Sequence, residues 1–346
     1  MKDLKYLAAL SIPIMALIGV YFKGYYAFLT PIYAFIILPV LDLLFPVNNS
    51  NLPTEEVSSN LENKLFDWLL YVNLPLVFGL VFYALFTVST TVFKLHETIG
   101  LIFSIGIVLA VNGINVAHEL GHRQATNERF LGEALLLPSF YMHFYIEHNF
   151  GHHLHAATPE DPATAKYNQS VYSFWFTSTF GQYIKSWKIQ NMLLNNNNKT
   201  FFSIKNDMLW ILLIQIGYLI IVYALFGNIG LLFAVTSGIV GIILLESVNY
   251  IEHYGLLRLK LPSGRYERVR EIHSWNSNHA IGRIVLYELT RHSDHHYKST
   301  KKYQILDSFE DSPQMPYGYP ASMGISLFPP LWFKIMNKRV PAEMIS

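Results

Sequence analysis

The sequence contains no cysteine and few charged residues. Without cysteine the chain cannot form disulfides, thiolate zinc sites or cysteine-bound iron–sulfur clusters, so any metal must be held by nitrogen or oxygen ligands. Only 14% of the 346 residues are charged, against roughly 25% in an average soluble domain. The formal net charge of +1 leaves no excess of positive charge for nucleic acid. With 52% hydrophobic residues, this composition indicates a membrane protein.

Six stretches are apolar over about the 20 residues that a membrane-spanning helix needs. The first follows Lys2 and Lys5 and lacks a small-residue cleavage pattern, so we expect a retained helix rather than a signal peptide. With six spans both ends lie on one side, together with every Lys and Arg except Lys23 and Lys94, and the positive-inside rule makes that side cytoplasmic. The predicted spans are 6–22, 26–46, 67–88, 97–116, 208–226 and 229–250.

Two further stretches are apolar or aromatic but are not predicted to cross. Glu133 and Pro138 interrupt residues 130–146, and a crossing there would separate neighbouring histidine clusters, so we expect a re-entrant or interfacial segment. The aromatic run 171–187 suits the headgroup level of a bilayer. No repeat or linker divides the chain, which predicts a single all-α membrane domain over 1–346 with a cytoplasmic histidine-rich cap.

Nine of the 14 histidines are clustered near the predicted ends of the spans. "HELGH" (118–122) alone also fits the H-E-x-x-H motif of zinc metalloproteases, with Glu119 as general base. A catalytic zinc takes only three protein ligands, whereas nine histidines would suit two metals with about four or five nitrogens each. Imidazole binds iron, zinc, copper and nickel, so the ligand type leaves the metal open. The candidate ligands are His118, His122, His148, His152, His153, His253, His292, His295 and His296.

These boxes and their surroundings resemble the integral-membrane alkane 1-monooxygenases, in the wider group of membrane desaturases and hydroxylases with di-iron histidine sites. The matching words are "NVAHELGHR", "YIEHNFGHHLHAATPEDPA", "ESVNYIEHYGL", "HSWNSNH", "LTRHSDHHYKSTKKYQ" and "PQMPYGYPASM". The resemblance implies that the nine histidines bind two iron ions, with dioxygen as co-substrate. It also implies terminal hydroxylation of n-alkanes drawn from the bilayer to 1-alkanols, electrons from rubredoxin and its NAD(P)H-dependent reductase, and a place in a bacterial inner membrane.

The resemblance further implies a residue that limits the substrate passage. In the family a bulky residue in the second span, several positions before a Pro-x-x-Asp word, is thought to set the length of that passage. Here the word is Pro39 to Asp42, and the limiting position falls on Ala34. A small residue there predicts activity on medium to long alkanes.

Three alternative functions remain open from the sequence: a related hydroxylase or desaturase acting on fatty acyl or alkyl-arene substrates, a membrane zinc protease, and a metal carrier. A carrier should place polar residues along a path through its spans. The predicted spans contain few polar residues, which favours a fixed site over a carrier. They are nearly all accounted for by Asp42, Asn73, Asn112, Asn115 and Glu246.

Other polar residues near the clusters are given supporting roles. A carboxylate or imidazole that accepts the far N–H of a metal-binding histidine fixes its tautomer and orientation. We expect His143 to be a hydrogen-bonded core residue, and His96 and His155 to lie at the surface. The residues expected to orient the ligands are Glu119, Glu147, Glu252, His273, His279 and Asp294.

Overall fold

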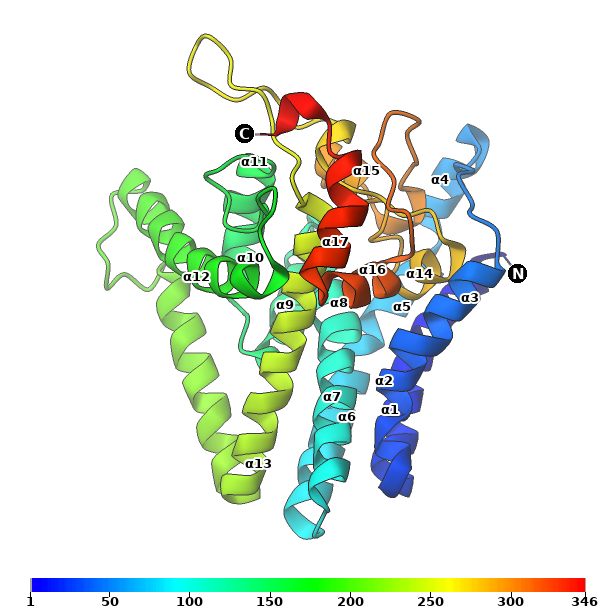
Figure 1. The fold of residues 1–346 in the computed structure, drawn as a ribbon. Coiled ribbons are helices and arrows are strands. Elements are labelled where there is room, and N and C mark those ends of the chain that lie inside the picture. Colours follow the sequence, from blue (N-terminus) through cyan, green and yellow to red (C-terminus); the bar gives the residue numbers. More distant parts are fainter. Residues whose placement is uncertain (1, 346) are drawn as a thin grey trace.

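The computed structural model describes residues 2–345 and is built from helices. In this part of the chain the β-structure is limited to isolated bridges. Within residues 2–345, five helical segments are long and apolar enough to cross a membrane, and they run side by side below a cap formed by the other helices (Figure 1). The predicted all-helical membrane fold is therefore confirmed. The five segments are Asp3–Phe22, Gly24–Leu44, Lys64–Thr90, Leu95–Gly121 and Asp207–His253.

The last segment, α13 (Asp207–His253), contains two arms. At Gly227 the backbone adopts φ 65° and ψ −164°, a conformation that favours glycine, and the chain reverses there to form the V in Figure 1. The arms match the two predicted spans 208–226 and 229–250. The sequence predicted a short turn between these two spans, and in the structure the single residue Gly227 makes that turn.

The other long segments change helix type along their length. Two of them contain π-helical turns, η3 (Tyr33–Ile37) and η4 (Leu109–Ile114), a form that is frequent at functional sites. The remaining elements of these four segments are η1 (Lys2–Leu10), α1 (Ser11–Phe22), η2 (Gly24–Phe28), α2 (Leu29–Ile32), α3 (Leu38–Leu44), α5 (Lys64–Tyr71), α6 (Asn73–Thr90), α7 (Leu95–Val108) and α8 (Asn115–Gly121).

The other helices, all short except the 26-residue α12, form the cap on the side where both ends of the described chain lie (Figure 1). They are α4 (Thr54–Glu62), α9 (Thr126–Leu136), η5 (Leu137–Ser139), α10 (Phe144–Glu147), η6 (His148–His152), α11 (His153–His155), α12 (Val171–Asn196), η7 (Glu271–His273), α14 (Ala280–Val285), α15 (His292–Tyr297), η8 (Tyr303–Ile305), α16 (Tyr319–Ser326), α17 (Pro329–Met336), η9 (Asn337–Arg339) and η10 (Ala342–Met344).

The segment 130–146 turns back instead of crossing. It contains the end of α9, then η5, and Phe140 adopts a left-handed φ of 57° before α10 begins. His118 and His148, on either side of the segment in the chain, have ring centroids only 4.5 Å apart. The histidines before and after this segment therefore lie on the same side. The aromatic stretch 171–187 lies in α12, which runs across the ends of the long helices in Figure 1.

Polar residues within the long helices tie segments together. Asn112 donates to Asn73 (2.8 Å), and the carboxylate of Asp42 accepts the backbone N–H groups of Ile281 and Gly282 at the start of α14 (both 3.0 Å). Glu246 accepts hydrogen bonds from Tyr141 (2.7 Å) and Gln182 (2.9 Å). Each of these side chains therefore makes at least one hydrogen bond that connects its segment to another part of the protein.

Candidate metal centre

All nine predicted ligands converge at the cap end of the long helices. They are supplied by α8 and its C-cap, η6, α11, α13 and α15. Their ring nitrogens form two groups, and within each group the candidate ligand atoms lie within 4.8 Å of one another. We name them the five-histidine group, which is His118, His122, His148, His153 and His295, and the four-histidine group, which is His152, His253, His292 and His296.

Within both groups the Nε2 atoms face one another. The Nε2 of His153 lies 3.0 Å from that of His148, and the Nε2 of His296 lies 2.9 Å from that of His292. The other close Nε2 pairs are separated by 3.1 or 3.2 Å. Two imidazole nitrogens bound at right angles to one cation, each at about 2.1 Å, are roughly 3.0 Å apart. The observed separations fit nitrogens that share a metal ion.

The local helix type decides which histidine enters which group. In the π-turn η6 the backbone follows i→i+5 hydrogen bonding, so His148 and His153, five residues apart, enter the same group. His152 between them enters the other group. In α15 the α-helical spacing of four places His292 and His296 together, while His295 enters the five-histidine group.

The donor set also fits bound metal chemically. The Nε2 of His118 is buried and has no hydrogen-bond partner among the described residues, which is costly for a polar atom unless a ligand satisfies it. A shell of imidazole nitrogens suits iron, zinc, copper or nickel, whereas calcium and magnesium prefer oxygen. Both groups are therefore suited to transition-metal ions.

The electrostatic environment keeps most of the imidazoles neutral. Burial, followed by the charge of neighbouring histidines, holds the pKa of His148, His295 and His296 well below the ordinary value, and lowers the pKa of His122 to about 3. Neutral imidazole is the form that binds metal, because its lone pair is free. His152 differs: burial lowers its pKa, but the carboxylate of Asp161 outweighs burial and raises it.

Asp161 is a site residue that was not predicted. Its Oδ2 lies 2.9 Å from the Nδ1 of His152, the ring nitrogen that faces away from the four-histidine group, and also accepts the hydroxyl of Thr164 (2.7 Å). This is the carboxylate–histidine arrangement that orients metal ligands. The signal in the sequence was the word "TPEDPA", which follows the second histidine box.

The six residues expected to orient ligands make other contacts. Within the described chain, none of their side chains is hydrogen bonded to the far nitrogen of a predicted ligand. Three of the six are acids that form an ion pair with a nearby basic residue instead. Glu119 pairs with Arg123 (3.0 Å), Glu147 with Lys185 (3.1 Å) and Asp294 with Lys301 (2.6 Å).

Glu252, His273 and His279 also differ from the expectation. Glu252 is buried and its Oε2 lies 3.3 Å from the Nε2 of His292, on the side of the ring that faces the four-histidine group. The Glu252 oxygen therefore lies on the same side as the Nε2 atoms that face one another, and it is not a hydrogen-bond partner of the far nitrogen, Nδ1, of His292. The Nδ1 of His273 accepts the backbone N–H of Arg270 (2.9 Å), and the Nδ1 of His279 is hydrogen bonded to the Ser277 hydroxyl (3.0 Å).

The three histidines without a predicted metal role lie outside both groups. His143 is buried between the rings of Tyr141 and Tyr183, but neither ring nitrogen has a hydrogen-bond partner among the described residues, so the expected hydrogen bond was wrong. His155 is partly exposed and is hydrogen bonded through Nδ1 to the carbonyl of Gly151 (2.9 Å). His96 is exposed and stacks on a tyrosine.

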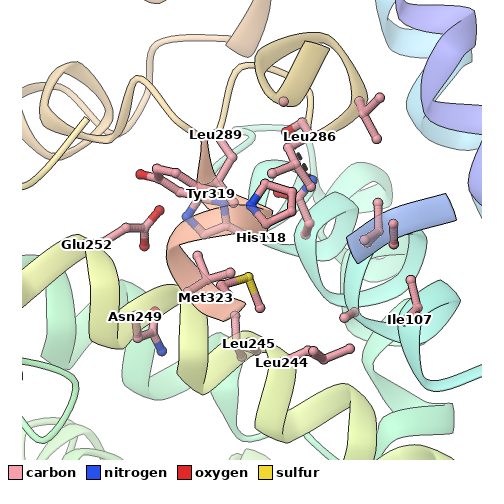
Figure 2. Close-up of a pocket in the computed structure, with 18 of the residues that line it drawn as sticks. Ile107, His118, Leu244, Leu245, Asn249, Glu252, Leu286, Leu289, Tyr319 and Met323 are labelled. Carbon is pink, nitrogen blue, oxygen red and sulfur yellow. Dashed lines mark hydrogen bonds between the residues drawn. The ribbon is translucent and has the colours of Figure 1, made fainter. Parts of the chain in front are cut away.

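A mostly apolar cavity, which we name the inner cavity, ends at the histidines. Its volume is about 90 Å³, and His118, His148 and His292 form part of its wall, so it touches both groups. Figure 2 shows His118, Glu252 and Tyr319 along one side and Leu244 and Leu245 along the other. Ala34 also lines the cavity. Fold and site together define an all-helical integral membrane protein with two histidine groups at the end of an apolar cavity.

Comparisons with known proteins agree with this class. The family model of fatty acid desaturases matches residues 94–324. The chain is 39% identical to the alkane 1-monooxygenase of Acinetobacter baylyi, over 92% of this chain and 78% of that protein. It is 36% identical to alkane 1-monooxygenase 1 of Alcanivorax borkumensis, over 88% of this chain and 75% of that protein. It is 29% identical to the xylene/toluene monooxygenase hydroxylase component of Pseudomonas putida, over 98% of this chain and 89% of that protein. The chain belongs to the alkane 1-monooxygenase family, which confirms the resemblance inferred from its histidine boxes.

Proposed function

We propose that this protein is an alkane 1-monooxygenase that hydroxylates the terminal carbon of medium to long n-alkanes. The reaction consumes one alkane, one dioxygen, two electrons and two protons, and yields one 1-alkanol and one water. The observation that carries the proposal is the inner cavity, because its apolar wall ends at both histidine groups. In this proposal, the end of an apolar chain held in the cavity would lie beside both histidine groups.

The metals proposed are two iron ions, one for each histidine group. The all-nitrogen donor sets are compatible with iron, zinc, copper or nickel, and the resemblance to di-iron membrane hydroxylases supports iron among them. When bound, iron supplies the activation of dioxygen that an unactivated C–H bond requires. The five-histidine group would use His118, His122, His148, His153 and His295, and the four-histidine group His152, His253, His292 and His296.

The residues of the chain would position the substrate and exclude water. An alkane has no polar group to bind, so only the shape of an apolar cavity can fix which carbon reaches the metals. Phe144, Leu245 and Val285 line the inner cavity, and Ala34 leaves room on the side of the second long segment. Held in this way, the terminal methyl group rather than the middle of the chain would meet the histidine end.

Two rival functions fit the site less well. In a zinc protease Glu119 would act as general base, but its carboxylate is buried in an ion pair with Arg123 and accepts the backbone N–H of Tyr303 (3.2 Å). A metal carrier would need a polar path along the long helices, where Asp42, Asn112 and Glu246 are hydrogen bonded within the protein instead.

We also propose that the metal centre faces the cytoplasm of a bacterium, from the inner membrane, and receives electrons from rubredoxin and its NAD(P)H-dependent reductase. The distribution of Lys and Arg supports this side, since Lys23 and Lys94 are the exceptions to a basic cap end. Two histidines, His122 and His153, are only partly buried, so the five-histidine group is the closer of the two to an external donor.

The test is an assay of purified, iron-loaded protein with rubredoxin, reductase, NADH and a series of n-alkanes, followed by detection of 1-alkanols. We expect two irons per chain and 1-alkanols from medium to long alkanes. Full iron content with no 1-alkanol from any alkane would refute the proposed activity. Oxidation of toluene or a fatty acid in the same preparation would then indicate that the protein is a related hydroxylase or desaturase instead.

A matched pair of histidine variants links activity to the site. His295→Ala removes a member of the five-histidine group, so we expect lower iron content and loss of 1-alkanol formation. His96→Ala removes an exposed histidine outside both groups and should change neither. Equal iron content and activity in the two variants would contradict the assignment of the site.

A further inference from the structure

A polar pocket lies where the first two long segments meet the cap, and none of the nine histidines lines it. Its volume is about 220 Å³, and it is formed by η1, by the chain that follows α3 and by α14, which packs against η1 and α3 (Figure 1). We name it the basic pocket, because its wall holds three cationic and two acidic side chains. The cations are Lys5, Arg283 and Arg291, and the acids are Glu56 and Glu288.

The buried acid of the pocket, Glu288, is already occupied by two hydrogen bonds. One of its carboxylate oxygens accepts the hydroxyl of Tyr6 (2.7 Å), and the other accepts the Nε of Arg283 (2.6 Å). The Nζ of Lys5 and the Nε of Arg291 lie farther from these oxygens, at 3.7 and 3.8 Å. Two cations therefore lie beside a carboxylate whose hydrogen bonds are made to other groups.

Arg291 is the most buried of the three cations and keeps one donor unpaired. Its side chain is only 3% exposed, and its terminal nitrogens donate to the backbone carbonyls of Ser50 and Leu306. Its Nε is buried and has no hydrogen-bond partner among the described residues, which is costly unless a ligand or water satisfies it. Burial, followed by the charge of Arg283, lowers the pKa of Arg291 to about 10, so a further negative charge beside it would be favourable.

The other side of the pocket is open at the edge of the membrane. Lys5 lies near the start of the first long segment, Asp3–Phe22, and residues 48–51 follow the end of the second, Gly24–Leu44. Residues 48–51 are exposed, and the side chain of Lys5 is 44% exposed. Basic pockets beside membrane helices are typical binding sites for the head groups of anionic lipids. The basic pocket therefore opens at the level where lipid phosphates lie.

We propose that the basic pocket binds a phosphate group, with Lys5 and Arg291 as donors. A phosphate carries negative charge on several acceptor oxygens, and Lys and Arg side chains bind it through charge-assisted hydrogen bonds. The head group of an anionic phospholipid would supply the phosphate from the bilayer, and inorganic phosphate would supply it from solution. Because Arg291 directly precedes His292, the first residue of α15, a bound phosphate would also hold the start of this helix in place. This binding does not depend on the proposed oxidation of alkanes.

Three substitutions that each remove one charge test the pocket. Lys5→Gln removes the exposed cation, and Glu56→Gln removes an acid that would repel a phosphate. Lys64→Gln is the matched control, because Lys64 is an exposed lysine at the start of the third long segment and does not line the pocket. None of the three residues is a predicted metal ligand.

The first measurement is the affinity of the full-length, iron-loaded protein for lipids added in detergent, followed by native mass spectrometry. The two lipids are dioleoylphosphatidylglycerol, which is anionic, and dioleoylphosphatidylcholine, which is zwitterionic. A basic residue near the membrane surface contributes roughly fivefold to the affinity for an anionic lipid, so we expect Lys5→Gln to bind phosphatidylglycerol about fivefold more weakly. Glu56→Gln should bind it more tightly, and Lys64→Gln should match the parent protein.

Hydrogen exchange locates the bound group and distinguishes its two sources. Phosphatidylglycerol should slow exchange in peptides covering 48–53 and 283–291 of the parent protein and of Lys64→Gln, but less in Lys5→Gln. The same protection by millimolar inorganic phosphate, with phosphatidylcholine as the only lipid, would support the pocket with free phosphate as its ligand. If neither ligand protected these peptides, or if Lys5→Gln and Lys64→Gln responded alike to both ligands, the proposal would be overturned and the charges would serve only to hold η1 against α14.

Discussion

At the scale of single residues, Asp161 makes the two histidine groups chemically different. It is fully buried and faces the Nδ1 of His152, and Lys185 lies 3.7 Å from its other oxygen. The interaction with His152, together with Lys185 and the Thr164 hydroxyl, outweighs the opposing effect of burial and holds the pKa of Asp161 below its ordinary value, so this partner is an anion. An anion behind one imidazole makes that imidazole a stronger donor. Among the described residues, the five-histidine group has no matching carboxylate hydrogen bond.

Asp161→Asn keeps the shape of this side chain and removes its charge. We expect the affinity of the four-histidine group for iron to fall by roughly 10- to 100-fold, as is typical when such a partner is lost. The measurement is the rate and extent of iron release to a chelator, with Mössbauer spectra to show which iron changes. Glu160→Gln is the control, because the Glu160 side chain is exposed and forms an ion pair with His155 (3.6 Å), which lies outside both histidine groups. Equal chelator release from both variants would contradict the role given to Asp161.

Ala34 is a second single residue with a predicted effect, because its small side chain leaves room in the inner cavity. Ala34→Trp would place an indole in that space, and we expect the products to shift from long to shorter 1-alkanols. Leu43→Trp is the control, since Leu43 is 68% exposed and does not line the inner cavity. The measurement is the profile of 1-alkanols from an alkane series, and a profile like that of Leu43→Trp would argue against Ala34 as a limiting residue.

At the scale of elements, the spacing of residues predicted which histidines come together but not how they divide. Spacings of three and four identify one face of an α-helix, and that rule would pair His148 with His152. The π-turn η6 pairs His148 with His153 instead, and a single sequence carries no local signal for an inserted π-turn. Asp161 was missed for a related reason, since it reaches His152 across a non-helical turn that spacing rules do not describe.

The position of η6 depends on a close approach to α12. A Cβ on Gly151 would lie 2.6 Å from Oε1 of Glu147 and 2.9 Å from Cδ1 of Ile189, so at least one of them would have to move. We expect Gly151→Ala to cost about 1–3 kcal/mol of stability, as overpacking usually does, and to lower iron content because three ligands lie in or next to this turn. Thermal unfolding in detergent and metal analysis are the measurements.

Gly79→Ala is the matched control for that change. Gly79 lies within α6, and a Cβ there meets nothing within 4 Å, so the same substitution should be neutral or should stabilise the helix by about 0.5–1 kcal/mol. If Gly151→Ala also left the unfolding midpoint and iron content unchanged, the close packing of η6 on α12 would not be what positions these histidines.

At the scale of the whole molecule, the histidine groups join parts of the chain that are far apart in sequence. His122 and His295 share one group, and His152 and His296 share the other. The long helices could be predicted because each is apolar over its own length. The way the short elements of the cap come together could not be predicted. An element such as α15, with six residues, is too short to be stable alone and depends on contacts with other parts of the chain.

Metal removal should therefore loosen the cap more than the long helices. A bound cation would satisfy the buried imidazole nitrogens that face one another at 2.9–3.2 Å. A ligand that binds only the folded state stabilises it by about 2.7 kcal/mol at 100 times its dissociation constant. After chelation we expect faster hydrogen exchange in peptides covering 148–155 and 292–297, little change in 73–90, and a lower unfolding temperature. Ferrous iron, but not calcium, should restore the protection, because the donors are nitrogens. Equal exchange in the cap with and without iron would mean that the protein alone holds these histidines in place, and that the metals contribute chemistry but no stability.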